Sequence, residues 1–178
     1  VDRLASEIFG SNIGRFFALL LLQVLVLDHL DVANGYMVPY LYVLFLLMLP
    51  FELPEWVTLL LGALTGFSVD VFTSTPGMHM SACTMMMFAR IHLLRLLAPR
   101  EGYEYGMRPT VPRMGMAWFI TYAGALILVH HLWLFFVEVY RFDRFFSTFF
   151  RAVLSAAFTL ALCLLAQFLT SSPERGRT

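Results

Sequence analysis

Asp70 is the first side chain in this sequence whose type and position suggest chemistry. It closes an apolar run that begins at Leu59, and an ionisable group at membrane depth is by default a hypothesis of function. As a functional group it could bind an arginine of a partner or a cationic ligand. As a structural group it could cap the turn at 73–77 or pair with an internal arginine such as Arg151. We favour the structural role, because Asp70 lies at a predicted helix end where water is near.

His130 and His131, followed by Glu138, are the second candidate group. Adjacent histidines on a helix point about 100° apart, so both do not easily face one metal ion. His131 and Glu138 share a helix face, but the spacing supplies no third ligand. We therefore predict no metal and no cofactor, and we expect these residues, together with Gln23, to make polar contacts between helices.

The sequence contains no H-E-x-x-H, G-x-S-x-G or Walker-type run. We therefore predict that the protein is not an enzyme. An intramembrane hydrolase or lipid transferase would need activity that depends on Asp70, His131 or Glu138.

The composition is typical of a membrane protein. The chain has 178 residues, of which 60% are hydrophobic and 13% are charged, whereas a soluble domain carries about 25% charged residues. The mean hydropathy is +0.76. The formal net charge is zero, which gives no reason to expect nucleic acid as a partner.

Apolar runs and their Pro and Gly boundaries predict an all-α bundle of about six transmembrane helices, forming a single membrane domain over 1–178. The predicted helices cover residues 13–27, 35–50, 54–71, 78–97, 114–139 and 148–169. The first is expected to be retained rather than cleaved as a signal peptide. The second is bounded by Pro39 and Pro50 and is short, so it is either a kinked span or a short, locally packed helix.

Gly62 and Gly66 lie on one face of the third predicted helix and form a small-xxx-small pair. Asp70 continues this face, and Gly77 and His79 follow in the turn and the start of the next helix. We expect this group to pack against a helix, either of the chain itself or of a partner.

The arginines predict the orientation. With six spans, nine of the twelve basic residues lie on the side that holds both termini, which favours the cytoplasm for that side. The loop 98–113 and the helix end before it form a basic segment that we expect near anionic lipid or a cytoplasmic partner. Its arginines are Arg95, Arg100, Arg108 and Arg113. Arg90 lies in the last two turns of the same helix, from where its long side chain can reach the interface.

Several stretches together resemble the bacterial rod shape-determining protein family MreD. The strongest is GALTGFSVDVF at 62–72 with STPGMH at 74–79, and the resemblance extends over residues 13–169. The other stretches are VPYLYV at 38–43, LPFELPEW at 49–56, RLLAPREG at 95–102 and HHLWLFFVE at 130–138.

The resemblance implies a non-enzymatic adaptor of the inner membrane that helps to control cell shape. Members of the family bind the single-span protein MreC in the cell-elongation complex. That complex links MreB filaments to peptidoglycan synthesis by the RodA glycosyltransferase and a class B penicillin-binding protein. The family fold is similar to the substrate-binding components of energy-coupling-factor transporters, so a vitamin-binding component is the alternative.

Overall fold

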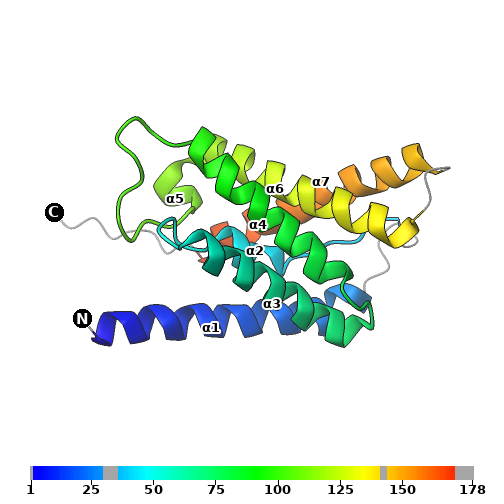
Figure 1. The fold of residues 1–178 in the computed structure, drawn as a ribbon, viewed down its shortest axis with the longest axis horizontal. Helices are drawn as coiled ribbons and strands as arrows, with labels where there is room; N and C mark the ends of the chain where they lie inside the picture. Colours follow the sequence, from blue (N-terminus) through cyan, green and yellow to red (C-terminus); the bar gives the residue numbers. More distant parts are fainter. Residues whose placement is uncertain (1, 30–35, 141–143, 171–178) are drawn as a thin grey trace.

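The computed structural model describes residues 2–29, 36–140 and 144–170, and these residues form helices without any strand. Figure 1 shows the helices running along one long axis. Their bounds are α1 (Asp2–Leu25), η1 (Leu27–His29), α2 (Val43–Leu47), α3 (Glu55–Thr73), α4 (Met78–Leu96), α5 (Val111–Met114), α6 (Met116–Val139) and α7 (Phe145–Thr170).

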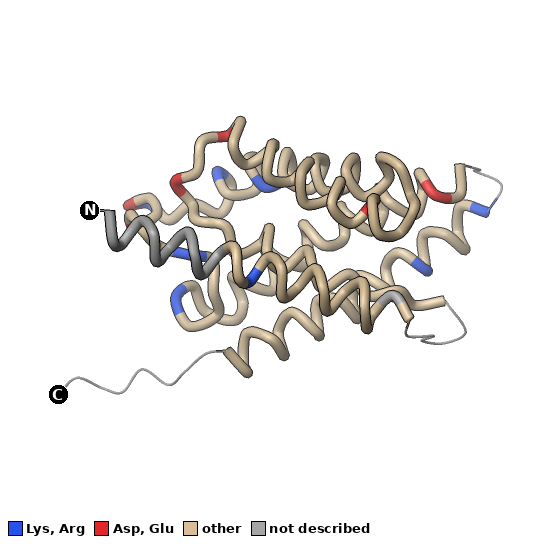
Figure 2. The backbone as a smooth tube through the Cα atoms, turned by 90° about the horizontal axis from the view of Figure 1, so that it is seen from below, with Lys and Arg blue, Asp and Glu red and all other residues tan. Residues whose placement is uncertain are grey.

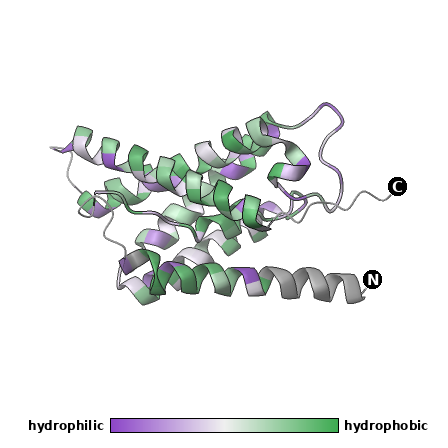
Figure 3. Cartoon of the chain, turned by 180° about the vertical axis from the view of Figure 1, so that it is seen from behind, coloured by the Kyte–Doolittle hydropathy of each residue, from purple (hydrophilic) through white to green (hydrophobic). Residues whose placement is uncertain are grey.

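Three helices, α3, α6 and α7, are long and apolar enough to cross a membrane, and α1 contains the shorter apolar stretch Ile13–Leu25. Large apolar side chains such as Leu64 and Phe67 are exposed on the outer face of α3. Figure 3 shows that hydrophobic residues dominate the helices, whereas the loop after α4 is hydrophilic. The prediction of an α-helical membrane protein is confirmed.

The start of α1 and the end of α7 lie at the same end of the bundle (Figure 1), which we call the terminal end. Helix α3 packs against α4, α4 against α6, and α6 against α7. The connection between α3 and α4 therefore lies at the opposite end, and the loop 98–110 lies at the terminal end.

Of the two forms predicted for 35–50, the structure agrees with the short, locally packed helix and not with a kinked span over the whole range. Residue 35 lies outside the described residues, and only Val43–Leu47 of the remainder is α-helical. The preceding residues follow α7 in the same direction. Tyr36 Oη donates to Ser147 O (3.4 Å), and Gln167 Nε2 donates to Met48 Sδ (3.1 Å).

Distance explains why this segment is not helical. From residue 147 to residue 167, α7 covers about 30 Å. Residues 36–48 would cover only about 18 Å as an α-helix, but an extended chain of that length reaches about 40 Å. The segment thus runs the length of the bundle only because much of it is extended. Apart from α2 (Val43–Leu47), none of residues 36–50 is α-helical. Because the segment passes from one end of the bundle to the other, we call residues 36–50 the non-helical pass.

The non-helical pass is the centre of the core. Every residue from Leu41 to Leu49 is buried, and α1, α4, α6 and α7 lie around it. Irregular backbone is tolerated at membrane depth where protein buries it and supplies its hydrogen bonds.

Candidate functional site: the polar interior

Asp70 holds the turn between α3 and α4. One carboxylate oxygen accepts from Thr75 Oγ1 and His79 N, each at 2.9 Å. The other accepts from Gly77 N at 3.1 Å and Met80 N at 3.0 Å. These backbone donors belong to the first turn of α4, where helical N–H groups have no intrahelical acceptor and a negative charge is favourable. Asp70 therefore caps α4, as the structural alternative predicts.

Gly62 and Gly66 bring α3 into close contact with α4. A Cβ atom on Gly66 would lie 2.3 Å from His79 O and 2.5 Å from Met80 Cα. One on Gly62 would lie 2.7 Å from Met87 Cγ. The helix that packs on this glycine face is thus α4 of the same chain.

Tyr42 joins two histidines in the middle of the bundle. Its hydroxyl lies 2.9 Å from His79 Nδ1 and 2.8 Å from His130 Nε2. Cys83 Sγ lies 3.7 Å from the same hydroxyl. The other ring nitrogen of His130, Nδ1, is buried without a hydrogen-bond partner.

The unpaired nitrogen fixes the direction of these bonds. An N–H without an acceptor is less favourable than a nitrogen lone pair without a donor. We therefore assign the proton of His130 to Nε2, which donates to Tyr42 Oη. The Tyr42 hydroxyl then donates its own proton to His79 Nδ1, so the three side chains form one directed chain.

His131 connects α6 to α7 and to the non-helical pass. Its Nδ1–H donates to Ile127 O at 2.8 Å, which leaves Nε2 to accept from Thr159 Oγ1 at 3.1 Å. Thr159 Oγ1 in turn accepts from Tyr40 N at 3.1 Å. The sequence predicts polar packing for His130 and His131. The contacts above are of this kind, because both rings are buried among side chains of other segments.

Gln23 is also a partner of the non-helical pass. Its Nε2 donates to Pro39 O at 3.0 Å and its Oε1 accepts from Leu41 N at 2.8 Å. A further side chain, Ser155 Oγ, accepts from Val38 N at 3.1 Å. These two bonds join Gln23 to backbone of the non-helical pass and not to the side of another helix.

Arg90 does not extend to the protein surface, unlike the long, interface-reaching side chain that the sequence suggests, because the residue is only 2% exposed. Its Nε donates to Tyr122 Oη at 2.8 Å, and a terminal nitrogen donates to Leu49 O at 2.6 Å and Pro50 O at 3.2 Å. Arg90 therefore fastens the end of the non-helical pass to α4 and α6.

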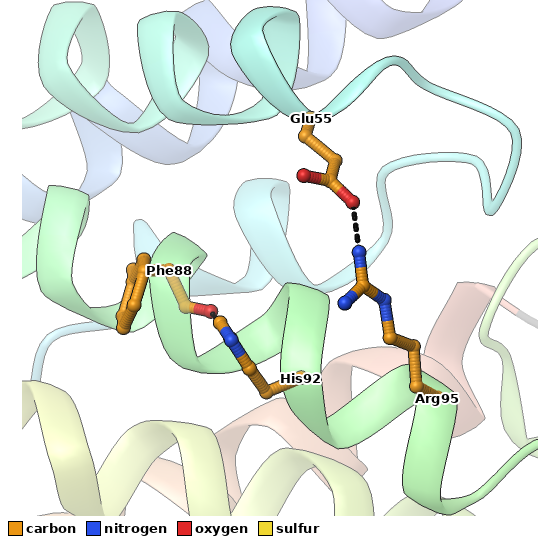
Figure 4. A network of polar contacts seen from close by, with 4 residues as sticks. All are labelled: Glu55, Phe88, His92 and Arg95. Atoms are coloured by element: carbon orange, nitrogen blue, oxygen red, sulfur yellow. Dashed lines mark hydrogen bonds and ion pairs between the residues drawn. The ribbon is translucent and has the colours of Figure 1, made fainter.

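The basic segment lies at the terminal end, as Figure 2 shows for the arginines of the described residues there. Arg95 forms an ion pair with Glu55 of α3, drawn in Figure 4 with the bond from His92 to Phe88 O in the same helix. Arg100 and Arg113 are exposed and Arg108 is half-buried. The structure thus brings only Arg95 of this group into an ion pair within its described part.

Tyr103 folds the loop 98–110 back onto the bundle. Its ring stacks on Phe51 with centroids 4.1 Å apart, and its hydroxyl donates to Leu94 O at 3.0 Å. Burial raises the pKa of Tyr103, so this phenol remains a donor at neutral pH.

Glu138 lies apart from the histidines. It pairs with Arg151 of α7 at 3.6 Å, and the guanidinium of Arg151 also lies 4.6 Å from the centre of the Phe135 ring. Arg151 is therefore a partner of Glu138 and not of Asp70. The described residues contain no group of three His, Cys, Asp or Glu side chains that could hold a metal.

Four members of the polar interior were not expected from the sequence, namely Tyr42, Arg90, Tyr122 and Thr159. One signal was present: Ser155 and Thr159 are four residues apart and so share one face of an apolar helix. This spacing does not reveal that the partner of the two side chains is extended backbone.

Comparison with known proteins adds no assignment. The chain matches no family model, no curated protein and no solved structure. The function has to be argued from the geometry of the chain itself.

Proposed function

We propose that this chain is a non-enzymatic scaffold of the bacterial inner membrane, of the MreD kind. In this role it binds the single-span protein MreC and helps to organise RodA, a class B penicillin-binding protein and MreB filaments during cell elongation. The observation that carries the proposal is that the polar side chains of the interior bind other parts of the same chain. Asp70, Gln23, Arg90 and the histidines bind other parts of the chain, so they serve the architecture of the bundle.

The proposed topology has six passes through the bilayer. Five are the helices α1, α3, α4, α6 and α7, and the remaining one is the non-helical pass. An even number of passes agrees with the start of α1 and the end of α7 at one end of the bundle. A fold similar to the substrate-binding components of energy-coupling-factor transporters is part of this proposal.

We place the terminal end in the cytoplasm. Within the described part of the chain, the last turn of α4 and the loop 98–113 at this end carry Arg95, Arg100, Arg108 and Arg113. Arg144 and Arg151 belong to the start of α7, at the opposite end. An excess of arginine in short loops is typical of the cytoplasmic side. Arg141, Arg175 and Arg177, which also entered the sequence prediction, lie outside the described residues.

An apolar hollow on α6 is the proposed contact for the transmembrane helix of MreC. It has a volume of about 560 Å³, and its lining residues are Leu132, Trp133, Phe136, Val137 and Tyr140. These positions recur every three or four residues, so they form one stripe along the helix. Helices associate in lipid by close packing, and a concave stripe lets a second helix pack more closely than a convex one.

Site-specific photocrosslinking in native membranes tests the proposal. A photoreactive residue at Phe136, in the hollow, should crosslink to a single-span membrane protein with a coiled-coil domain. The matched control is Leu64, which is exposed on the outer face of α3 and should give no such product. Equal products at both positions, or none at either, would contradict the proposed contact.

Purification of the tagged protein in mild detergent tests the function itself. Mass spectrometry should find cell-wall synthases with the protein. Recovery of an ATPase pair with a transmembrane coupling subunit, or of a stoichiometric vitamin, would replace the scaffold by the transporter component.

A further inference from the structure

Arg90 is a buried cation whose hydrogen-bond partners are neutral. The three oxygens that accept from it belong to Tyr122, Leu49 and Pro50. The ion pairs of the described residues join Arg95 to Glu55 and Arg151 to Glu138, so no described carboxylate pairs with Arg90. Neutral oxygens satisfy the donors of a guanidinium but leave its charge without a counterion, which is unfavourable away from water.

A pocket opens beside this cation. It has a volume of about 300 Å³ and lies between the start of α3, the last turns of α4 and the loop after α4. Arg90 forms part of its wall together with Arg95, Glu55 and Tyr103. The three formal charges on this wall, two positive and one negative, sum to one positive charge.

Exposed apolar and aromatic side chains lie beside the pocket. Trp56, next to Glu55 in sequence, is 69% exposed, and exposed tryptophan is typical of the membrane–water interface. Leu96, in the last turn of α4, is 81% exposed. An apolar surface and a polar pocket therefore meet at one level, where a phospholipid presents both its acyl chains and its phosphate.

We propose that this pocket binds a phosphate anion, the group carried by phospholipid headgroups, with Arg90 as the counter-charge inside the pocket and Arg95 at its mouth. Planar guanidinium groups match phosphate oxygens in geometry and in charge. In this site Glu55 competes with the phosphate for Arg95 (Figure 4). Binding does not depend on which proteins the chain assembles with.

Removal of the competitor gives the decisive test. Glu55→Gln frees Arg95 and deletes the negative charge of the wall, so affinity for phosphate should rise about fivefold. Loss of folding cannot raise affinity, which makes this variant informative where Arg90→Gln is not. Glu101→Gln is the matched control, because Glu101 is exposed at the same end of the protein and outside the pocket wall.

Arg95→Gln should have the opposite effect and weaken binding about fivefold. Its matched control is Arg100→Gln, which removes an exposed charge of the same sign from the neighbouring loop. Arg90→Gln should weaken binding about tenfold or more, because it removes about one charge-assisted contact with the phosphate.

Affinity is read from the rise in melting temperature of the purified full-length protein as a ligand is added in detergent. The probes are phosphatidylglycerol, inorganic phosphate and, as the lipid without phosphate, diacylglycerol with the same acyl chains. A response to phosphatidylglycerol alone supports the site with lipid as the source, and a response to inorganic phosphate as well supports the site for phosphate from either source. No response to either anion, or equal gains for Glu55→Gln and Glu101→Gln, would overturn the proposal.

Discussion

Gly66→Ala should separate α3 from α4 near the turn that Asp70 holds. The new Cβ would lie 2.3 Å from His79 O and 2.5 Å from Met80 Cα. Both atoms belong to backbone, so no side chain can rotate away, and the helices must move apart by about 1 Å to reach ordinary contact. Such a gap forfeits a quarter to a half of the attraction between the contacting atoms.

The same movement lengthens the bonds from His79 N and Met80 N to Asp70, which are now 2.9 and 3.0 Å. We therefore expect Gly66→Ala to lower the free energy of unfolding by about 3 kcal/mol, the sum of overpacking and weakened caps. The assay is reversible unfolding in detergent with increasing dodecyl sulfate, followed by circular dichroism.

Two other glycines serve as graded controls. Gly62→Ala should cost about 1 kcal/mol, because its nearest atom is Met87 Cγ at 2.7 Å, which side-chain rotation can move, and its nearest backbone atom, Cys83 O, lies farther away at 3.0 Å. Gly14→Ala has nothing within 4 Å and should stabilise α1 by about 0.5 kcal/mol. A Gly66→Ala variant as stable as Gly62→Ala would refute the inferred contact between the two backbones.

Three further substitutions test other parts of the polar interior by the same unfolding assay. Asp70→Ala leaves three backbone N–H groups without an acceptor and should cost about 3 kcal/mol. Asp70→Asn keeps one acceptor oxygen but turns an amide NH2 towards the donors of the other, so it should cost about 2 kcal/mol. Equal costs would argue against the capping role. Gln23→Leu leaves Pro39 O and Leu41 N unpaired and should lower the free energy of unfolding by about 2–4 kcal/mol. A stability like that of the wild type would contradict the inferred role of the two Gln23 hydrogen bonds. Glu138→Gln should cost less than about 1 kcal/mol, because Glu138 is 42% exposed in its pair with Arg151, and a larger loss would mean that this pair carries more of the fold than its exposure suggests.

Sequence predicted the long helices because each is a sustained apolar run, and Pro or Gly marks the ends of the spans 54–71 and 78–97. The predicted span 54–71 corresponds to Glu55–Thr73, and 78–97 corresponds to Met78–Leu96. The predicted helix 114–139 is divided by Gly115, which has a φ of 84° and ends the short α5 before α6 begins. A backbone angle of this kind favours glycine, but glycine alone does not reveal it.

The non-helical pass could not be predicted from its own residues. Residues 37–49 are as apolar as a helix of the same length, and hydropathy does not distinguish the two. Its extended form depends on acceptors that other segments supply, namely Gln23, Ser155 and Thr159. The position of Arg90 was hidden for a similar reason, because its acceptors are carbonyl groups of this same pass.

On the proposed topology, the non-helical pass also depends on a helix that is synthesised later. The backbone N–H of Val38 donates to Ser155, which comes 117 positions later in the chain. The N–H of Tyr40 donates to Thr159, which comes 119 positions later. Until α7 has been made, those backbone N–H groups have no such partners, and unsatisfied groups of this kind are excluded from lipid. The middle of the bundle therefore obtains its full set of hydrogen bonds only once α7 has been made.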